Sequence, residues 1–184
     1  MGKTHPHLDK PLRDFLTSHP LFFVASAPRA DSGHINLSPK GLDTFKILAP
    51  DEIAYLDLVG SGIETVAHVR ENERLVLMFC AFAGPPRIVR LWGRARVVEP
   101  EDDAFNSLRA NFESELAVRA IITLKLSRIA DSCGYGVPLF EYKGDRPQLD
   151  YWREQKSAAE IEAYKTRMNA RSIDGLPGLR SRCP

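Results

Sequence analysis

Short apolar runs, each the length of one β-strand, constrain this chain of 184 residues more than any other feature. Examples are LFFVASA, which begins at Leu21, and LVLMFCAF, which begins at Leu75; both are far too short to span a bilayer. Polar turns of hairpin length separate most of these runs, as is typical of antiparallel strands, and we expect about six strands. With helical patterns at both ends and at two crossings, the chain is predicted to be mainly β, a small closed β-barrel with peripheral helices.

Local patterns indicate where the main elements begin and end. Two β-rich runs, Leu21–Pro28 and Ile35–Gly41, flank the polar turn RADSGH and predict a hairpin. Gly93 marks a bend in the long strand RIVRLWGRARVVE. The helical patterns are a stretch from Leu8 that ends at His19-Pro20, GIETVAHVREN, PEDDAFNSLRANF and one long helix, QLDYWREQKSAAEIEAYKTRMNA.

The chain reads as a single domain. Residues 1–20 are expected to form an N-terminal helix, residues 21–140 the barrel, and residues 141–184 a C-terminal helix and a Gly/Pro tail that pack on the barrel. Its 43% hydrophobic residues are enough for one core.

Composition excludes several classes of protein. The net charge is +1 and Lys and Arg are scattered, which argues against a nucleic-acid partner. No leader or membrane segment is visible, so we expect a cytoplasmic protein. The histidines and the three cysteines show no metal-ligand spacing, and no metal site is predicted. Cys80 is expected to be a reduced core residue, whereas the role of Cys133 stays open.

The sequence Gly60-Ser61-Gly62 precedes a helical pattern and has two possible roles. The N–H groups of a first helical turn have no intrahelical partner, so Ser61, Gly62 and the hydroxyl of Thr65 could hold a phosphate. Alternatively, Ser61 caps the helix and Glu64 completes a capping box. Spacing alone favours the capping role.

Two strands carry polar side chains that could meet a ligand. Asn36, Ser38 and Lys40 share one face of a strand, which Pro39 places at an edge or interrupts. On the long strand, Arg90 and Trp92 lie side by side and would suit a planar aromatic ligand with a charged tail. The alternatives are a solvent-facing polar row and an Arg stacked on a Trp at a surface.

Three stretches in fixed order, INLSPKG, YLDLVGSGIETVAHVRENERLVLMFCAF and PPRIVRLWGRARVV, resemble the flavin-binding split β-barrel proteins of the pyridoxamine 5'-phosphate oxidase family. The chain is most similar to the uncharacterised bacterial branch described as pyridoxamine 5'-phosphate oxidase-related FMN-binding proteins. The resemblance covers Leu21 to Val98 and continues more loosely through DSCGYGVPLFEY and SIDGLPGL.

The resemblance implies an antiparallel split barrel, a homodimer, and FMN bound in two clefts at the subunit interface. It implies that the strand Asn36, Leu37, Ser38, Pro39, Lys40 runs beside the flavin ring and ribityl chain. It further implies that Tyr55 and Asp57 border the cofactor, that Ser61, Gly62 and Thr65 hold its phosphate, and that Arg90 and Trp92 approach the ring.

Two departures from the family pattern affect the expected function. Family members often carry a pair of basic side chains where this chain has SGIET, and the oxidase itself has a C-terminal Arg/His-rich strand that is replaced here by a helix and tail. Pyridoxamine phosphate oxidase activity is therefore not expected.

We expect an FMN-dependent oxidoreductase that acts on an unidentified small molecule, with no catalytic side chain that can be named. The alternatives are a non-catalytic flavin-binding module for storage, sensing or electron transfer, or the same barrel with a deazaflavin coenzyme or haem. The tail SIDGLPGLRSRCP and the segment CGYGVP are expected to line or cover the substrate side of the flavin pocket; the alternative for the tail is a disordered end.

Overall fold

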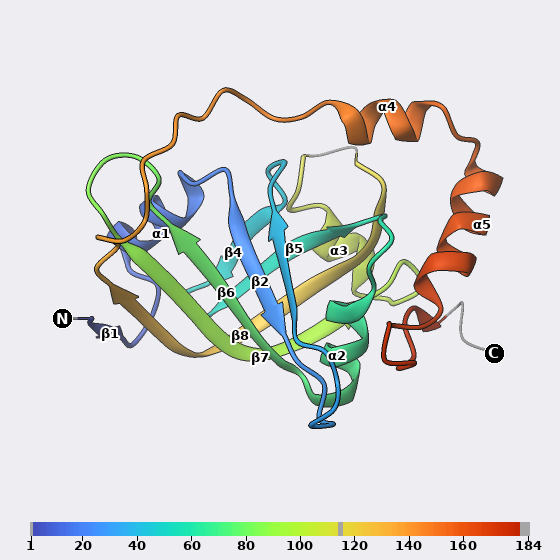
Figure 1. The fold of residues 1–184 in the computed structure, drawn as a ribbon, viewed down its shortest axis with the longest axis horizontal. Helices are drawn as coiled ribbons and strands as arrows, with labels where there is room; N and C mark the ends of the chain where they lie inside the picture. The colour runs from blue at the N-terminus through green and yellow to red at the C-terminus, as the bar shows by residue number, and fades with distance from the viewer. Residues whose placement is uncertain (1, 114–115, 181–184) are drawn as a thin grey trace.

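The computed structural model describes residues 2–113 and 116–180 of the chain. In these ranges, eight strands form one antiparallel sheet in the order β3-β2-β6-β7-β8-β5-β4, with β1 paired to β8 (Figure 1). The strands are β1 Thr4–His5, β2 Phe22–Ser26, β3 Asn36–Lys40, β4 Phe45–Ala49, β5 Glu52–Leu58, β6 Arg74–Cys80, β7 Ile88–Val98 and β8 Val118–Ser132. The helices are α1 Lys10–Thr17, α2 Glu64–Asn72, α3 Phe105–Arg109, α4 Gln148–Glu154 and α5 Ala158–Asn169. The predicted hairpin is β2 and β3, and the mainly β prediction is confirmed.

The sheet curls into a barrel that stays open between its two end strands, β3 and β4. The pattern-based prediction of a closed barrel is therefore wrong, and the split barrel implied by the family resemblance is confirmed. β3 is an edge strand, the position in which a strand tolerates Pro39. The chain crosses the split through a tight turn, where Leu42 (φ 61°) and Asp43 (φ 48°) adopt left-handed backbone conformations.

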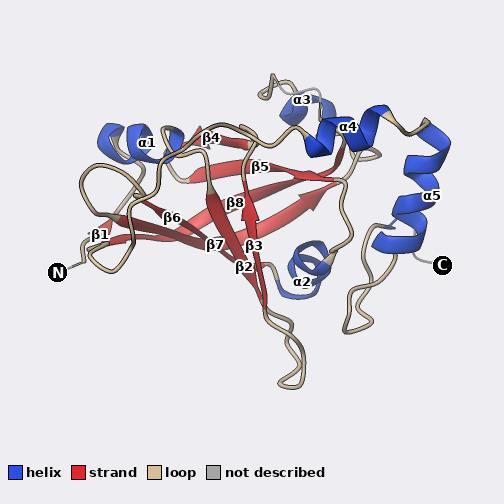
Figure 2. Cartoon of the chain, turned by 45° about the horizontal axis from the view of Figure 1, so that its top comes forward, coloured by secondary structure: helices blue, strands red, loops and turns tan. Residues whose placement is uncertain are grey.

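The barrel interior holds the main core, and α1 closes one end of it. Asp9 caps this helix by accepting a hydrogen bond from the Leu12 N–H at 3.0 Å, and Leu12 and Leu16 are fully buried. Phe22 stacks on Phe79 in the interior with ring centroids 5.2 Å apart. Helix α2 packs near the opposite end, so α1 and α2 bracket the barrel (Figure 2).

The long strand β7 bends at Gly93, as predicted. The register with β8 shifts between Trp92 and Gly93, and a Cβ atom on Gly93 would lie only 2.0 Å from the Lys125 carbonyl oxygen. Only glycine allows this close approach of the two backbones. The helix predicted over PEDDAFNSLRANF is reduced to the single short helix α3.

The C-terminal part differs from the single long helix that the sequence pattern predicts. It forms α4 and α5, which are separated by a break before Ser157. Ser157 caps α5 in a capping box, in which its hydroxyl accepts from the Glu160 N–H and the Glu160 carboxylate accepts from the Ser157 N–H. A side chain that satisfies the first turn in this way starts a new helix.

The tail after α5 is packed rather than disordered as far as Arg180. Leu179 is 2% exposed and belongs to the main core. Cys183 lies outside the described residues. None of the helices in the described ranges has the length and apolar character needed to cross a membrane.

Candidate functional site

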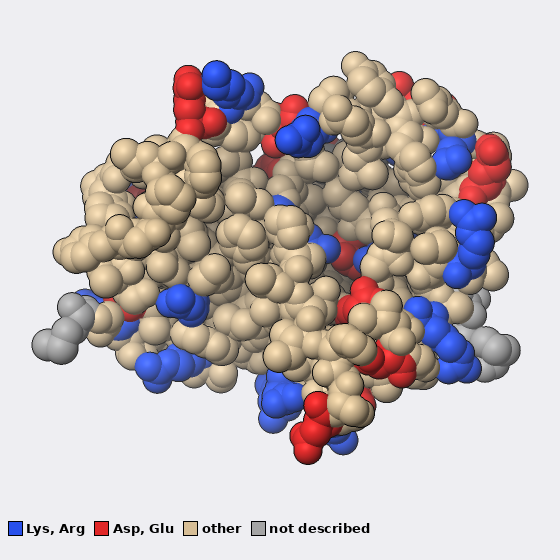
Figure 3. All heavy atoms as spheres, in the orientation of Figure 1, with Lys and Arg blue, Asp and Glu red and all other residues tan. Residues whose placement is uncertain are grey.

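Five of the predicted site residues meet at the split of the barrel, and we call them the polar seam: Asn36, Ser38 and Lys40 of β3, Asp57 of β5 and Thr65 of α2. Asn36 donates from Nδ2 to the Thr65 hydroxyl at 2.9 Å, and Lys40 donates from Nζ to Asp57 Oδ1 at 3.2 Å. The β3 side chains face inward because the strand alternates, with Leu37 and Pro39 pointing outward. Figure 3 shows this face of the molecule hollowed beside the C-terminal helices, with charged groups of both signs at its centre.

Asp57 anchors the seam and has a second cationic partner that the sequence prediction missed. Arg119 donates from Nε to Asp57 Oδ2 at 2.8 Å, and the two side chains are 5% and 0% exposed. Burial acts to raise the pKa of Asp57, but Arg119 and Lys40 outweigh it and lower the pKa below its usual value. Two cations therefore face one carboxylate, which leaves an excess positive charge at the seam.

A β-bulge explains why Arg119 points inward. Asp57 pairs with Ala120 and Leu58 pairs with Val118, so Arg119 is the extra residue of β8 at this point. A bulge re-aims a side chain that regular alternation would place elsewhere. The available sequence signal was a lone Arg in the apolar stretch AVRAII.

Two hydrogen bonds to the Gly60 carbonyl oxygen hold the loop Gly60-Ser61-Gly62 in place. The Gly60 oxygen accepts from Arg119 Nη1 and from Asn169 Nδ2, each at 2.9 Å. Ser61 and Gly62 themselves are exposed. Asn169 at the end of α5 was also missed by the sequence analysis, because no local pattern links it to a loop 109 positions away.

The capping interpretation of Ser61 is wrong. The N-cap of α2 is Ile63, and no side chain caps this helix. Glu64 does not complete a capping box; its Oε1 accepts from the N–H of Ile173 in the tail at 3.2 Å. The first turn of α2 thus remains available to a ligand, although the Glu64 carboxylate opposes an anion there.

Tyr55 lies in the core instead of bordering an open groove. It is 0% exposed and packs edge-on against Phe22, with ring centroids 5.8 Å apart. Burial, together with the nearby Asp57 charge, raises the pKa of Tyr55 well above its usual value. Its hydroxyl has no partner in the described part of the chain, and the same holds for Ser38 Oγ in the seam.

The remaining predicted residues lie on the outer face of the sheet. Leu37 is 64% exposed, Arg90 donates to the Ser132 hydroxyl at 3.1 Å, and the Arg128 guanidinium lies 5.9 Å from the Trp92 ring. The alternative of an Arg stacked on Trp92 at the surface is therefore met, but the stacking residue is Arg128 of β8 and not Arg90. β7 is three strands from β3, about 14 Å at ordinary strand spacing, so one chain does not bring Arg90 and Trp92 to the seam.

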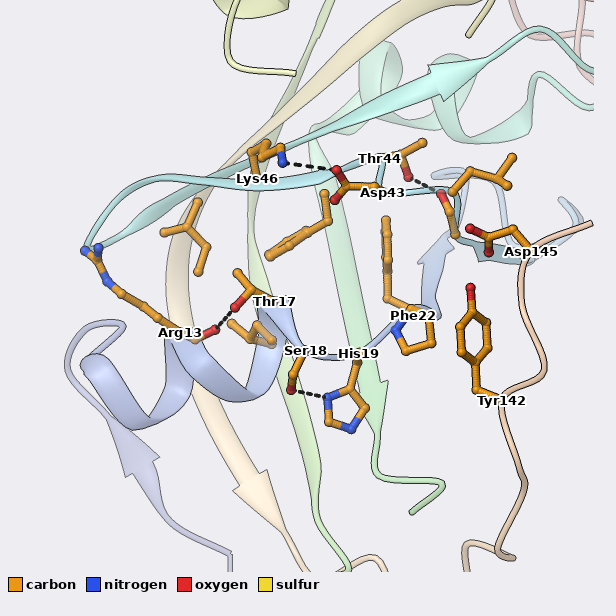
Figure 4. Close-up of a pocket in the computed structure, with 16 residues that line it drawn as sticks. Arg13, Thr17, Ser18, His19, Phe22, Asp43, Thr44, Lys46, Tyr142 and Asp145 are labelled. Carbon is orange, nitrogen blue, oxygen red and sulfur yellow. Dashed lines mark hydrogen bonds and ion pairs between the residues drawn. The ribbon is translucent and has the colours of Figure 1, made fainter. Parts of the chain in front are cut away.

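A separate cavity of about 600 Å³ opens at the Lys40 end of β3 (Figure 4). It lies between the end of α1, the Gly41–Thr44 turn and the segment that follows β8. His19, Phe22, Asp43 and Tyr142 line it, and a hydrogen bond to Asp145 raises the pKa of Tyr142. Sequence patterns missed this cavity because irregular segments provide much of its lining.

The tail and CGYGVP lie at opposite ends of the sheet in one chain (Figure 1). Gly134 packs against Pro86 and Arg87, whereas Gly178 packs against Asn169 and Ile63. A single chain therefore does not bring the two segments to one pocket. Cys133 is exposed.

Comparisons with known proteins support the fold. The family model for pyridoxamine 5'-phosphate oxidase matches residues 8–133. The pyridoxamine 5'-phosphate oxidase family protein ustO of Aspergillus flavus is 41% identical over 187 aligned residues, which cover 92% of this chain and 75% of that protein.

Two solved structures share the fold. HupZ of Group A Streptococcus is 16% identical with a TM-score of 0.54, and the match covers 66% of this chain and 90% of HupZ. An FMN-binding protein of Syntrophomonas wolfei is 13% identical with a TM-score of 0.50, and the match covers 73% of this chain and 91% of that protein. At these identities the likeness establishes the fold alone.

Proposed function

The chain belongs to the pyridoxamine 5'-phosphate oxidase family, and on this premise we propose that it binds FMN and acts as an oxidoreductase on a small molecule still to be identified. A bound flavin supplies hydride and electron-transfer chemistry, while the protein supplies orientation and electrostatics. The fold shared with an FMN-binding protein makes FMN the first flavin to test.

The polar seam is the observation that carries this proposal. Lys40 and Arg119 share the single carboxylate of Asp57, so the seam favours an anionic ligand. The buried hydroxyl of Ser38 has no partner within the described residues, as expected of a group that awaits a polar ligand. An exposed loop and the first turn of α2 adjoin the seam and offer N–H groups.

Two groups of residues would bind the two ends of FMN. Ser61, Gly62 and Thr65 would hold the phosphate, while Asn36, Ser38 and Lys40 would contact the ribityl chain and ring. The family's pair of basic side chains is absent from SGIET, and Arg119 supplies a cation beneath the loop instead. The negative charge of Glu64 lowers the affinity that this cradle can reach.

We extend the proposal to a homodimer with the flavin at the subunit interface. The outer face of the sheet leaves Ile35 78% and Leu37 64% exposed, beside a shallow cavity that Ile35 and Trp92 line. A second copy on this face would cover apolar surface, and closed two-fold dimers are the commonest soluble assembly. It would also offer Arg90 and Trp92 to the partner's flavin.

The absorption spectrum of the purified protein, with mass spectrometry of the released ligand, tests the cofactor. We expect a yellow protein that releases about one FMN per chain. A colourless protein that also leaves the fluorescence of added FMN unchanged would rule out FMN as the cofactor. The absorption spectrum of haem or of a deazaflavin would identify that group as the cofactor instead.

Turnover is tested separately on the FMN-loaded protein. The oxidoreductase proposal requires a small molecule that bleaches the flavin anaerobically and is itself oxidised, with colour returning in air. A flavin that stays oxidised against a broad panel of amines, alcohols and nicotinamide donors would favour a non-catalytic flavin-binding module.

A further inference from the structure

We call residues Asn169 to Arg180, the last that the structure describes, the clasp. The clasp makes hydrogen bonds to three segments around the polar seam. Asn169 binds Gly60, the Ile173 N–H binds Glu64, and the Asp174 carboxylate accepts from the N–H and Nδ1 of His34 at 2.8 and 2.6 Å. His34 precedes β3, and Glu64 opens α2. The clasp therefore joins the loop, the helix and the strand that would surround a bound flavin.

We propose that the clasp fixes the orientation of the loop Gly60-Ser61-Gly62, so that this loop can bind the phosphate of the flavin. Asn169 is the positioning residue through which the clasp does so. This inference rests on the proposed function. It differs from a cover over the substrate side of the flavin, because the contacts gather at the Ser61 end of the seam.

Peptide geometry carries the argument from Asn169 to the ligand. The Gly60 carbonyl and the Ser61 N–H belong to one planar trans peptide and point in opposite directions. Arg119 and Asn169 hold the carbonyl oxygen on the protein side. The Ser61 N–H is consequently turned away from the protein, on an exposed residue, where an anion can accept from it.

Asn169 is itself locked by the remainder of the clasp. Its side chain is 0% exposed, and its backbone oxygen accepts from the Leu179 N–H at 3.0 Å. Gly178 lies so close that an added Cβ atom would be 2.2 Å from that oxygen. The turn back to Leu179 thus needs glycine at this point, and Leu179 anchors it in the core.

A second feature of Asn169 also points to a ligand. Its Nδ2 donates to Gly60, while its buried Oδ1 has no partner among the residues described. A buried amide oxygen without a partner is costly in a folded protein, so an ordered water that also bridges to a bound phosphate would stabilise it.

Paired titrations of FMN and riboflavin test the proposal, since the two flavins differ only in the phosphate. For Asn169→Ala we expect roughly a ten-fold loss of FMN affinity, the size expected for a lost hydrogen bond to a charged group, and less than about a two-fold loss for riboflavin. The smaller truncation Asn169→Ser gives the same comparison if Asn169→Ala does not fold.

Asn72→Ala is the matched control. Asn72 is buried and donates from Nδ2 to the Ala27 carbonyl at 2.9 Å, but it lies at the other end of α2. This variant should lose thermal stability like Asn169→Ala while keeping the wild-type ratio of FMN to riboflavin affinity.

The outcomes separate the two proposals. If the wild-type protein binds FMN but Asn169→Ala weakens both flavins equally, or if Asn72→Ala loses the same discrimination, the clasp does not position the loop. If the wild-type protein binds neither flavin, the proposed function fails first and the inference falls with it.

Discussion

Arg119 Nε lies 2.8 Å from Asp57 Oδ2, although 62 positions separate the two residues in the sequence. Because both side chains are buried, each charge depends on the other for its stabilisation. The same guanidinium reaches the Gly60 carbonyl, so one ion pair connects the floor of the seam to the loop at its end.

Removal of Asp57 should destabilise the fold strongly. Asp57→Ala leaves Arg119 buried without a counter-ion, and breaking a buried pair costs about 3–5 kcal/mol. The free energy of unfolding in urea measures the effect. The control is Asp51→Ala, because Asp51 pairs with Lys125 where both side chains are largely exposed, and we expect a loss of about 1 kcal/mol or less. Equal losses in the two variants would show that Asp57 is not a structural anchor.

Lys40→Ala and Thr65→Ala should each weaken FMN binding about ten-fold, because each removes a polar partner at the seam. Fluorescence titration of the apoprotein measures this affinity. Lys46→Ala is the control: Lys46 of β4 pairs with Asp43 of the preceding turn at 3.3 Å and does not belong to the seam. Titration curves that match the wild-type protein for both seam variants would place the flavin elsewhere.

Local patterns predicted one half of the seam correctly. Strict alternation in a short strand put Asn36, Ser38 and Lys40 on one face, and the structure directs that face into the split. The break between α4 and α5 was also readable, since Ser157 and Glu160 have the capping-box spacing. The continuous helical pattern across this break predicts a single helix, and the capping-box signal outweighs it in the structure.

The contacts that hold the surroundings of the seam leave no local trace in the sequence. A bulge turns Arg119 inward, and Asn169 reaches Gly60 only through tertiary packing. Tyr55 and Asp57, two positions apart on β5, share a strand face, but the curling of the sheet places Tyr55 deep in the core. In the proposed homodimer, Arg90 and Trp92 would reach a flavin only from the partner copy, and the pattern of one chain does not specify that placement.

Acid should weaken the junction of β1, β7 and β8 through Asp131. Its carboxylate accepts from the Lys3 N–H at 2.9 Å and from Arg87 at 2.8 Å. Partial burial acts to raise the pKa of Asp131, but the hydrogen bonds from Arg87, Lys3 and His5 outweigh it and lower the pKa to about 2.

The sign of the pH dependence follows from this lowered pKa. The folded-state value lies below the unfolded value of about 3.9, so the stabilisation is complete above about pH 4 and is lost as the pH falls toward 2. Relative to Asp131→Asn, the wild-type advantage in unfolding free energy should be constant near neutral pH and shrink between pH 4 and 2. An advantage that persists unchanged at pH 2 would contradict this role.

Leu37→Asp should dissociate the proposed homodimer and release FMN with it. Leu37 lies on the outer face of the edge strand β3, 64% exposed, and we place that face against the second subunit. A carboxylate there would lose its hydration at the interface, whereas in a monomer it stays in water. Sedimentation velocity measures the mass, and the retained flavin absorbance of each species shows whether the site needs the partner.

Leu139→Asp provides the matched comparison, since Leu139 is 77% exposed but lies in the irregular segment after β8. It should remain dimeric and yellow. If Leu37→Asp sediments as a dimer with FMN bound, the outer face of β3 is not the interface. A wild-type monomer that retains FMN would refute the dimer itself, and the flavin would then rest on the seam of one chain alone.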